Sequence, residues 1–175
     1  MLFRRQLFVR FLLLVLTVRI GVLGAREPAT TSTTKLADKI VVEKSKRTLT
    51  LMSRNGVLKT YKVALGGQPV GPKNRQGDHK TPEGVYSVDR KVSNSTFHRA
   101  LHLSYPNAAD RERAKKLGVN PGGDVEIHGL GAKFGWVGSA HRLHDWTDGC
   151  IAVTNEEIDE IWNLVEVGTP VEINP

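Results

Sequence analysis

The chain of 175 residues has a single cysteine and few aromatic side chains, which make up 6% of it. One cysteine excludes an internal disulfide framework and any zinc site that needs two thiolates. Charged residues at 25% and hydrophobic residues at 39% are typical of a globular protein, and the length suits one domain. This composition excludes a collagen-like, disordered or multi-span membrane chain. The lone thiol is therefore either a buried spectator or a nucleophile.

Acidic residues are absent from the first 25 positions, which contain four arginines. The rest of the chain holds 21 cations against 18 anions, so most of the net charge of +7 lies at the amino terminus. The remaining cations are scattered, and none of the patterns of nucleic-acid-binding motifs is present. Nucleic acid is not expected as a partner.

Residues 1–25 have the layout of a secretory signal peptide: a basic start, an apolar run and small residues before Ala25. The uninterrupted run over 11–18 is about half of the roughly 20 residues that a membrane-spanning helix needs. We therefore expect cleavage near Ala25, no stable membrane span afterwards, and a location in the periplasm or cell envelope. The alternative is an uncleaved amphipathic extension. Residues 26–37 are predicted to be a disordered tether, and 38–175 a single domain.

The predicted domain is mostly β, with alternating or apolar strands and two helices. Asn55-Gly56 predicts a type I′ hairpin turn. A helix is expected over 108–117, capped by Asn107 and ended by Gly118, and a second begins with the capping box Thr154-Asn-Glu-Glu157. The strands are predicted at 40–42, 48–52, 57–65, 85–88, 100–103, 124–127, 150–153 and 171–173, with a long loop over 66–84.

Two apparent ligand motifs do not support a cofactor or metal. The glycine-rich loop at 66–84 lacks the Gly-Lys-Ser/Thr ending of a phosphate-binding loop. His98 and His102 lie on a predicted strand, so about 13 Å separates them and one ion cannot bridge them. We expect no metal and no cofactor.

The remaining constellation pairs a histidine with the cysteine. Glu126-Ile127-His128-Gly129 ends a strand at a histidine, and Thr147-Asp148-Gly149-Cys150 follows at another strand junction. A cysteine nucleophile needs an imidazole to take its proton and backbone N–H groups for the oxyanion. The alternative is that Cys150 is a small buried hydrophobe and His128 a core histidine.

These residues resemble a known family. His128-Gly129 followed by Thr147-x-Gly149-Cys150-Ile151 is similar to the signature of the L,D-transpeptidase catalytic domain with the YkuD fold, and Thr81-Pro82-x-Gly84 matches a weaker element. The run from Thr147 to Glu157 is similar to the YafK-like subgroup. Many members carry histidine where this chain has Asp148. The resemblance implies a mostly β fold, a β-sandwich or open barrel with a few short helices, including one near the carboxyl terminus.

The resemblance also implies acyl transfer on the tetrapeptide stems of peptidoglycan. Cys150 would be the nucleophile that releases a terminal D-Ala and forms a thioester, which an amine of a second stem would resolve into a 3→3 cross-link. His128 would carry the proton, the Gly129 carbonyl would orient its ring, and the Gly149 backbone would hold the oxyanion. A thiolate beside an oxyanion pocket should also open carbapenems.

Substrate-binding candidates lie around this pair. Arg142 and His144, with His141, fall in a loop predicted over 138–146, where Arg142 would meet stem carboxylates by a forked contact; a solvated loop is the alternative. Thr147 and Tyr105 complete the candidates. Two other functions stay open: a cysteine hydrolase of the same fold that trims stems or wall-linked peptides, and a non-catalytic wall-binding module.

Overall fold

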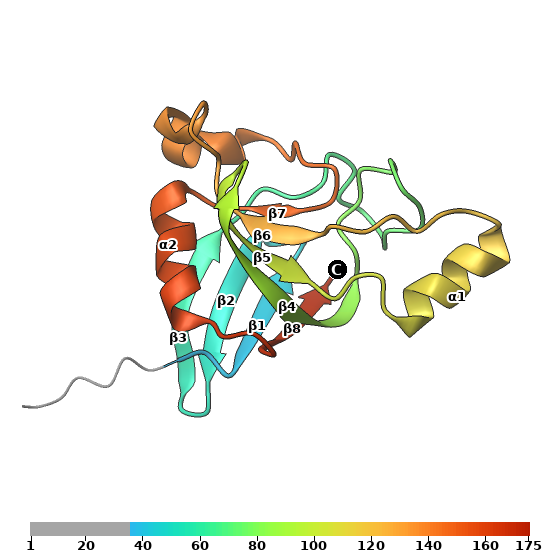
Figure 1. Ribbon diagram of the computed structural model, residues 1–175, viewed down its shortest axis with the longest axis horizontal. Coiled ribbons are helices and arrows are strands. Elements are labelled where there is room, and N and C mark those ends of the chain that lie inside the picture. The colour runs from blue at the N-terminus through green and yellow to red at the C-terminus, as the bar shows by residue number, and fades with distance from the viewer. Residues whose placement is uncertain (1–35) are drawn as a thin grey trace, which may run out of the picture. The chain divides into compact units, whose positions relative to one another are not determined.

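The structure, a computed structural model, describes residues 36–175 and is built around one curved sheet. Its eight strands lie in the order β3-β2-β1-β8-β4-β5-β6-β7, as Figure 1 shows. The bounds are β1 Lys39–Glu43, β2 Thr48–Ser53, β3 Gly56–Lys62, β4 Gly84–Ser95, β5 His98–Leu103, β6 Glu126–His128, β7 Ile151–Ala152 and β8 Pro170–Asn174. Pairing is antiparallel except for β1 with β8 and β6 with β7.

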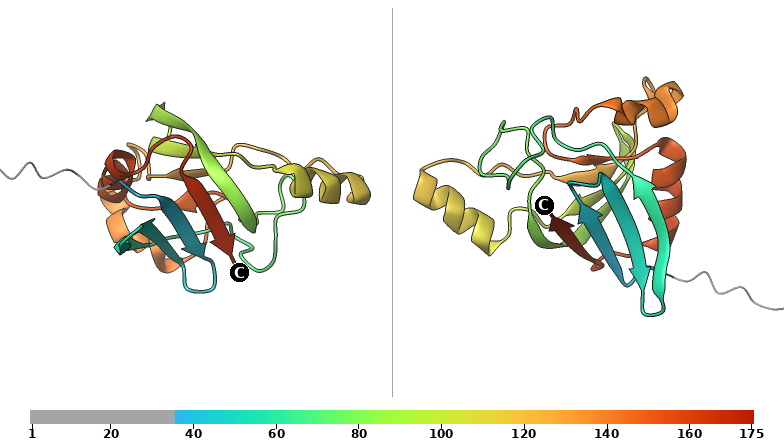
Figure 2. Two further views of the ribbon diagram at one scale, coloured as in Figure 1. Left: turned by 90° about the horizontal axis from the view of Figure 1, so that it is seen from below. Right: turned by 180° about the vertical axis from the view of Figure 1, so that it is seen from behind.

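The two ends of the sheet meet just beyond β3. Ala64 and Ala152 exchange two backbone hydrogen bonds, with N–O distances of 3.0 and 2.9 Å, and Gly66 bridges to Thr147. The sheet thereby bends round on itself, and Figure 2 shows its curvature from two further sides. The prediction of a mostly β sandwich or open barrel is confirmed.

The core lies inside this curved sheet and follows from side-chain alternation. Along β1 and β2 every second residue is buried, which places the side chains of Ile40, Val42, Leu49 and Leu51 in the core. The hairpin turn occurs where it was predicted, but only Gly56 takes a positive φ, of 115°, so the turn is not the type I′ form expected for Asn55-Gly56.

Both predicted helices are present and begin at their predicted caps. Helix α1, Ala108–Leu117, starts at Asn107 in a capping box completed by Asp110, and Gly118 ends it in the left-handed conformation. Helix α2, Asn155–Leu164, starts at Thr154 in a second capping box. It packs its buried Ile158 and Ile161 toward β5 and β6, whereas α1 projects away from the sheet (Figure 1).

A third helical element occupies the segment predicted as a loop. The 3-10 helix η1, Gly135–Leu143, is interrupted by Gly138, whose φ of 52° and ψ of −137° are not helical. Gly138 divides the segment into two pieces, each shorter than the 11–18 residues over which a helical period is recognised.

The folded domain reaches further toward the amino terminus than the predicted boundary at 38. Ala37 is buried, and its backbone N–H donates to the Leu164 carbonyl at 2.7 Å. The proposed signal peptide, and all but the last two residues of the proposed tether, lie outside the described residues.

Across residues 36–175, none of the helices combines the length and the apolar character needed to cross a membrane.

Candidate active site

The parallel pairing of β6 with β7 brings the predicted histidine and cysteine to adjoining strand ends. His128 is the last residue of β6 and pairs in register with Ala152, while Ile127 pairs with Ile151. Cys150 directly precedes β7 and is two residues from Ala152. Because side chains alternate along a strand, Cys150 and His128 lie on the same face of this pair.

Glycine is required at the turn before the cysteine. Gly149 has a φ of 129°, and a Cβ there would stand 2.5 Å from the Lys80 carbonyl oxygen. The Thr147 hydroxyl holds the same turn: it donates to the Cys150 carbonyl at 2.7 Å and accepts from the Gly149 N–H at 3.2 Å. Thr147 is therefore buried in the turn rather than open to a ligand, and the Gly149 N–H is engaged in this state.

His128 is fixed in one tautomer. Its Nδ1 lies 2.6 Å from the Gly129 carbonyl oxygen, which can only accept, so Nδ1 carries the hydrogen and Nε2 keeps a free lone pair. The ring is almost fully buried and packs against Phe97, with ring centroids 4.4 Å apart, and against the edge of Trp146 at 6.0 Å. Burial lowers the pKa of His128, so the imidazole is neutral at neutral pH and can accept a proton.

The Cys150 thiol is also neutral in the resting site. Burial raises its pKa from 9.0 to about 11, and the carboxylates of Glu126 and Asp148 act in the same direction, while the Lys73 ammonium opposes them. The thiol donates to the Asp124 carbonyl at 3.5 Å. Both groups are therefore neutral at neutral pH, so the resting site holds no preformed thiolate.

Cys150 opens into a polar hollow of about 310 Å³, here called the cysteine cavity. Two loops wall it, one between β3 and β4 and the other after α1. The lining residues are Lys73, Gln76, Gly77, His79, Gly122, Gly123, Asp124, Val125, Asp148 and Cys150.

Charged pairs organise this cavity. Lys73 is buried, and its Nζ donates to Asp78 at 2.8 Å and to the Asp148 carbonyl at 3.4 Å. The same Nζ lies 3.5 Å from where a Gly149 Cβ would stand, so the ammonium adjoins the nucleophile turn. His79 Nδ1 lies 2.6 Å from the Asp148 carboxylate, which is largely exposed. Sequence patterns did not single out Lys73 or this His79–Asp148 pair.

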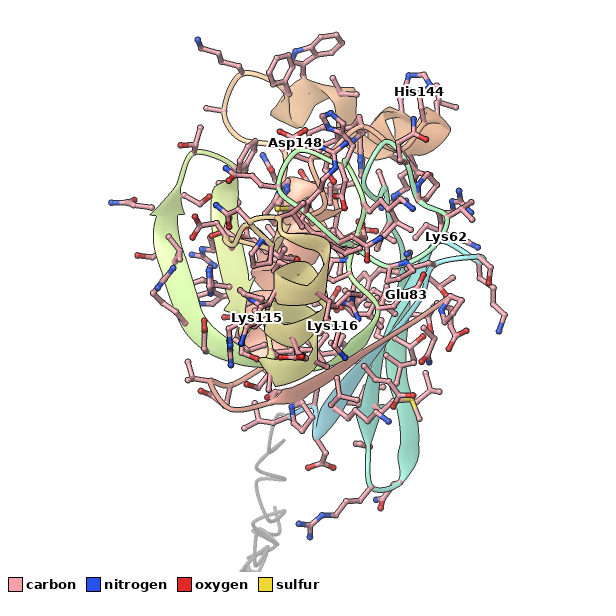
Figure 3. All side chains as sticks on the ribbon, turned by 90° about the vertical axis from the view of Figure 1, so that its right-hand side faces the viewer. Lys62, Glu83, Lys115, Lys116, His144 and Asp148 are labelled. Carbon is pink, nitrogen blue, oxygen red and sulfur yellow. The ribbon has the colours of Figure 1, made fainter. Side chains whose placement is uncertain are left out.

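The four substrate-binding candidates do not gather in the cysteine cavity. Arg142 forms an ion pair with Glu157, a residue of the α2 capping box. Tyr105 is buried, and its hydroxyl donates to the Pro121 carbonyl at 2.8 Å, which anchors one cavity wall from behind. His144 is exposed on the segment after η1; Figure 3 shows it apart from Asp148.

Within residues 36–175, no three His, Cys, Asp or Glu side chains are grouped closely enough to hold a metal ion. His98 faces Asp159, and His102 faces Asp89 and Asp124.

Comparison with known proteins places the domain. The family model described as YkuD, the L,D-transpeptidase catalytic domain, matches residues 37–173. The chain belongs to this family. YafK of Escherichia coli strain K12, named as a proposed L,D-transpeptidase, is 35% identical over 132 residues, which are 72% of this chain and 46% of YafK. The chain therefore spans about half the length of the curated relatives that it matches.

Solved structures agree on the fold. The helical cell shape determining protein Pgp2 of Campylobacter jejuni is 26% identical with a TM-score of 0.59, and the match covers 77% of this chain and 46% of Pgp2. An L,D-transpeptidase of Xylanimonas cellulosilytica matches with a TM-score of 0.52 at 16% identity, over 81% of this chain and 62% of that one. The second likeness concerns the fold alone.

Proposed function

We propose that this L,D-transpeptidase domain transfers acyl groups of peptidoglycan stem peptides through a thioester on Cys150. The observation that carries the proposal is the register of β6 with β7, which puts Cys150 and His128 on one face of this pair, in a chain of this family. The free Nε2 of a neutral imidazole is the base that a neutral thiol needs.

The first half-reaction forms the thioester. The Cys150 sulfur attacks the carbonyl of the amide before a terminal D-Ala, and its proton passes to His128 Nε2. The C–N bond then breaks, and the D-Ala nitrogen takes that proton and leaves as the free amine. The Lys73 ammonium beside the nucleophile turn would stabilise the oxyanion, together with the Gly149 N–H once it turns from Thr147.

The second half-reaction resolves the thioester. An amine of a second stem attacks the thioester carbonyl, loses a proton to His128, and forms the amide of a 3→3 cross-link. The same proton returns to the departing Cys150 sulfur. Stem peptides of this kind are found outside the cytoplasmic membrane, so this substrate fits the proposed signal peptide and an envelope location.

Hydrolysis is the second candidate, favoured by the His79–Asp148 pair. This imidazole and carboxylate, 2.6 Å apart, line the cysteine cavity and are largely exposed to solvent. A second base in that position would remove a proton from water as well as from an acceptor amine. Water would then attack the thioester and release a free tripeptide.

Mass analysis of one incubation separates these functions. We expect the full chain to convert a disaccharide tetrapeptide into a cross-linked dimer with loss of D-Ala. A tripeptide without dimer would indicate a hydrolase. Unchanged substrate with a folded wild-type chain would contradict catalysis and favour the wall-binding module. Cys150→Ala is the matched control, and it should be folded and inactive.

A further inference from the structure

A second hollow is lined in part by the two aromatic residues that contact His128. It has a volume of about 320 Å³ and shares no lining residue with the cysteine cavity. We call it the aromatic pocket. Its lining residues are Phe97, Leu130, Phe134, Val137, Ala140, His141, His144 and Trp146. Two of them, Phe97 and Trp146, are the side chains whose rings contact His128.

His141 gives this pocket an unsatisfied polar group. The residue is 7% exposed, and neither of its ring nitrogens has a hydrogen-bond partner. Buried polar groups are usually paired, so an imidazole whose two nitrogens are covered and unpaired just beneath a pocket lining indicates that a ligand pairs them in another state. Burial and the neighbouring Arg142 lower the pKa of His141 to about 4, so at neutral pH the ring offers one N–H donor and one acceptor.

The rest of the wall selects a neutral ligand. The lining contains no Asp, Glu, Lys or Arg, so it offers no ion pair to the carboxylates of a stem peptide. Phe134, Trp146 and Phe97 are 62%, 41% and 37% exposed, which leaves ring faces open to contact. Flat apolar surfaces with one donor and one acceptor suit a sugar ring, whose C–H faces pack on aromatic side chains.

We propose that the aromatic pocket binds an N-acetylated amino sugar of the glycan strand to which the stem is attached. The acetyl methyl group would lie among Leu130, Val137 and Ala140, and its carbonyl oxygen would accept from the His141 N–H once the ring turns toward the pocket from its covered position. A sugar hydroxyl would donate to the other ring nitrogen. This assignment rests on the proposed function only in its choice of a glycan as the ligand. The stem peptide would then bind in the cysteine cavity and the sugar in the aromatic pocket.

Direct binding to an inactive chain tests the proposal. We use Cys150→Ala, titrate it with N,N′-diacetylchitobiose, and follow binding by calorimetry and by total tryptophan fluorescence. We expect saturable binding that cellobiose, which lacks the acetamido groups, does not reproduce. His141→Phe should weaken it at least tenfold while the melting temperature stays equal or rises, because the variant removes an unpaired buried polar group.

The matched control is Tyr61→Phe, which removes another buried, unpartnered polar atom outside the pocket and should leave sugar binding unchanged. The proposal is overturned if diacetylchitobiose does not bind, if cellobiose binds equally, or if His141→Phe binds as well as its parent. Binding of the dye 8-anilinonaphthalene-1-sulfonate without binding of the sugar would instead assign an apolar ligand and also overturn it.

Turnover separates this inference from the proposed function. On an otherwise wild-type chain, His141→Phe should raise KM for the disaccharide tetrapeptide about tenfold and leave KM for the sugar-free tetrapeptide unchanged. Sugar binding without any D-Ala release would contradict the proposed function alone. D-Ala release with the same KM for both substrates would contradict the pocket assignment alone.

Discussion

The cysteine cavity and the aromatic pocket have similar volumes and opposite chemistry. In the cysteine cavity the charges come in pairs, Lys73 with Asp78 and His79 with Asp148. In the aromatic pocket no lysine, arginine or carboxylate is present, and His141 has no partner. The comparison indicates that one hollow is built to stabilise changing charge and the other to hold a neutral group.

His128 contacts two rings of the aromatic pocket, Phe97 and Trp146, and these contacts contribute to the burial of its imidazole. Burial lowers the pKa of this imidazole, while the hydrogen bond to the Gly129 carbonyl acts to raise it and fixes the tautomer. A buried neutral imidazole beside a neutral thiol avoids the desolvation of an ion pair until substrate arrives. The residues of the aromatic pocket therefore support the proposed reaction at Cys150 by keeping His128 buried and neutral.

The largest expected effect comes from Cys150→Ala. Loss of the nucleophile should abolish D-Ala release, while the melting temperature stays nearly the same because one half-buried sulfur is removed. Intact-mass spectrometry with a carbapenem should give a single adduct on wild type and none on the variant. An equal adduct on both proteins would show that the acylated group lies elsewhere.

Next in size is His128→Asn, for which we expect D-Ala release to fall about 10³-fold, the range for loss of a general base. His144→Asn is the matched control, because His144 does not line the cysteine cavity and its substitution should change the rate less than threefold. The rate of thiol alkylation across pH should likewise change only in the first variant. The reverse pattern would make His144 the base.

Lys73 should have an intermediate effect, visible in the titration of the thiol. With the pKa of Cys150 near 11, alkylation by iodoacetamide should rise about tenfold per pH unit from pH 7 to pH 10. Removal of a nearby cation raises a thiol pKa further, so Lys73→Met should alkylate threefold to tenfold more slowly at pH 8 and release D-Ala about tenfold more slowly.

Two companion variants show whether charge or folding causes that effect. Lys80→Met alters a cation on the same loop that does not line the cavity, and it should behave as wild type. Lys73→Met leaves the buried Asp78 carboxylate unpaired, so the double variant with Asp78→Asn should recover the melting temperature. Recovery of D-Ala release in the double variant would contradict a direct role for Lys73.

The Lys73–Asp78 ion pair should also have a smaller effect on the free energy of unfolding at low pH. The Lys73 ammonium and three backbone N–H groups hold the pKa of Asp78 at about 2, below its ordinary 3.8, despite burial, which acts to raise it. The unfolded carboxyl binds protons first, so this stabilisation is complete above pH 4 and is lost as the pH falls toward 2. We expect about 1 kcal/mol of unfolding free energy to be lost over that window in wild type. Asp78→Asn should not show this loss.

The features that sequence patterns predicted are those governed by local rules. Both helices begin at their predicted caps, because a cap needs only residues three positions apart. The strands followed from alternation, and the register of β6 with β7 puts His128 and Cys150, the two residues of the family motif, on one face. The element η1 was missed because Gly138 breaks its regularity.

The features that were missed depend on contacts between distant segments. Lys73 lies beside the nucleophile turn, where the Lys80 backbone also approaches Gly149 closely, and both come from a distant loop. His141 became a candidate once both its nitrogens were found buried without a partner, and no sequence motif reports that. Arg142, which was expected to contact stem carboxylates, forms an ion pair with Glu157 of the α2 capping box in this structure.

The smallest expected effect is that of Asp148→Asn, and it bears on the choice between transfer and hydrolysis. The Asp148 side chain is 85% exposed, so solvent and salt screen its charge, and D-Ala release should change less than threefold. If His79 and Asp148 together activate water, the variant should shift the products from tripeptide toward dimer. His79→Gln should shift them in the same direction, because both changes remove the same base. A product ratio that neither variant alters would exclude this pair from resolving the thioester and assign that step to His128 alone.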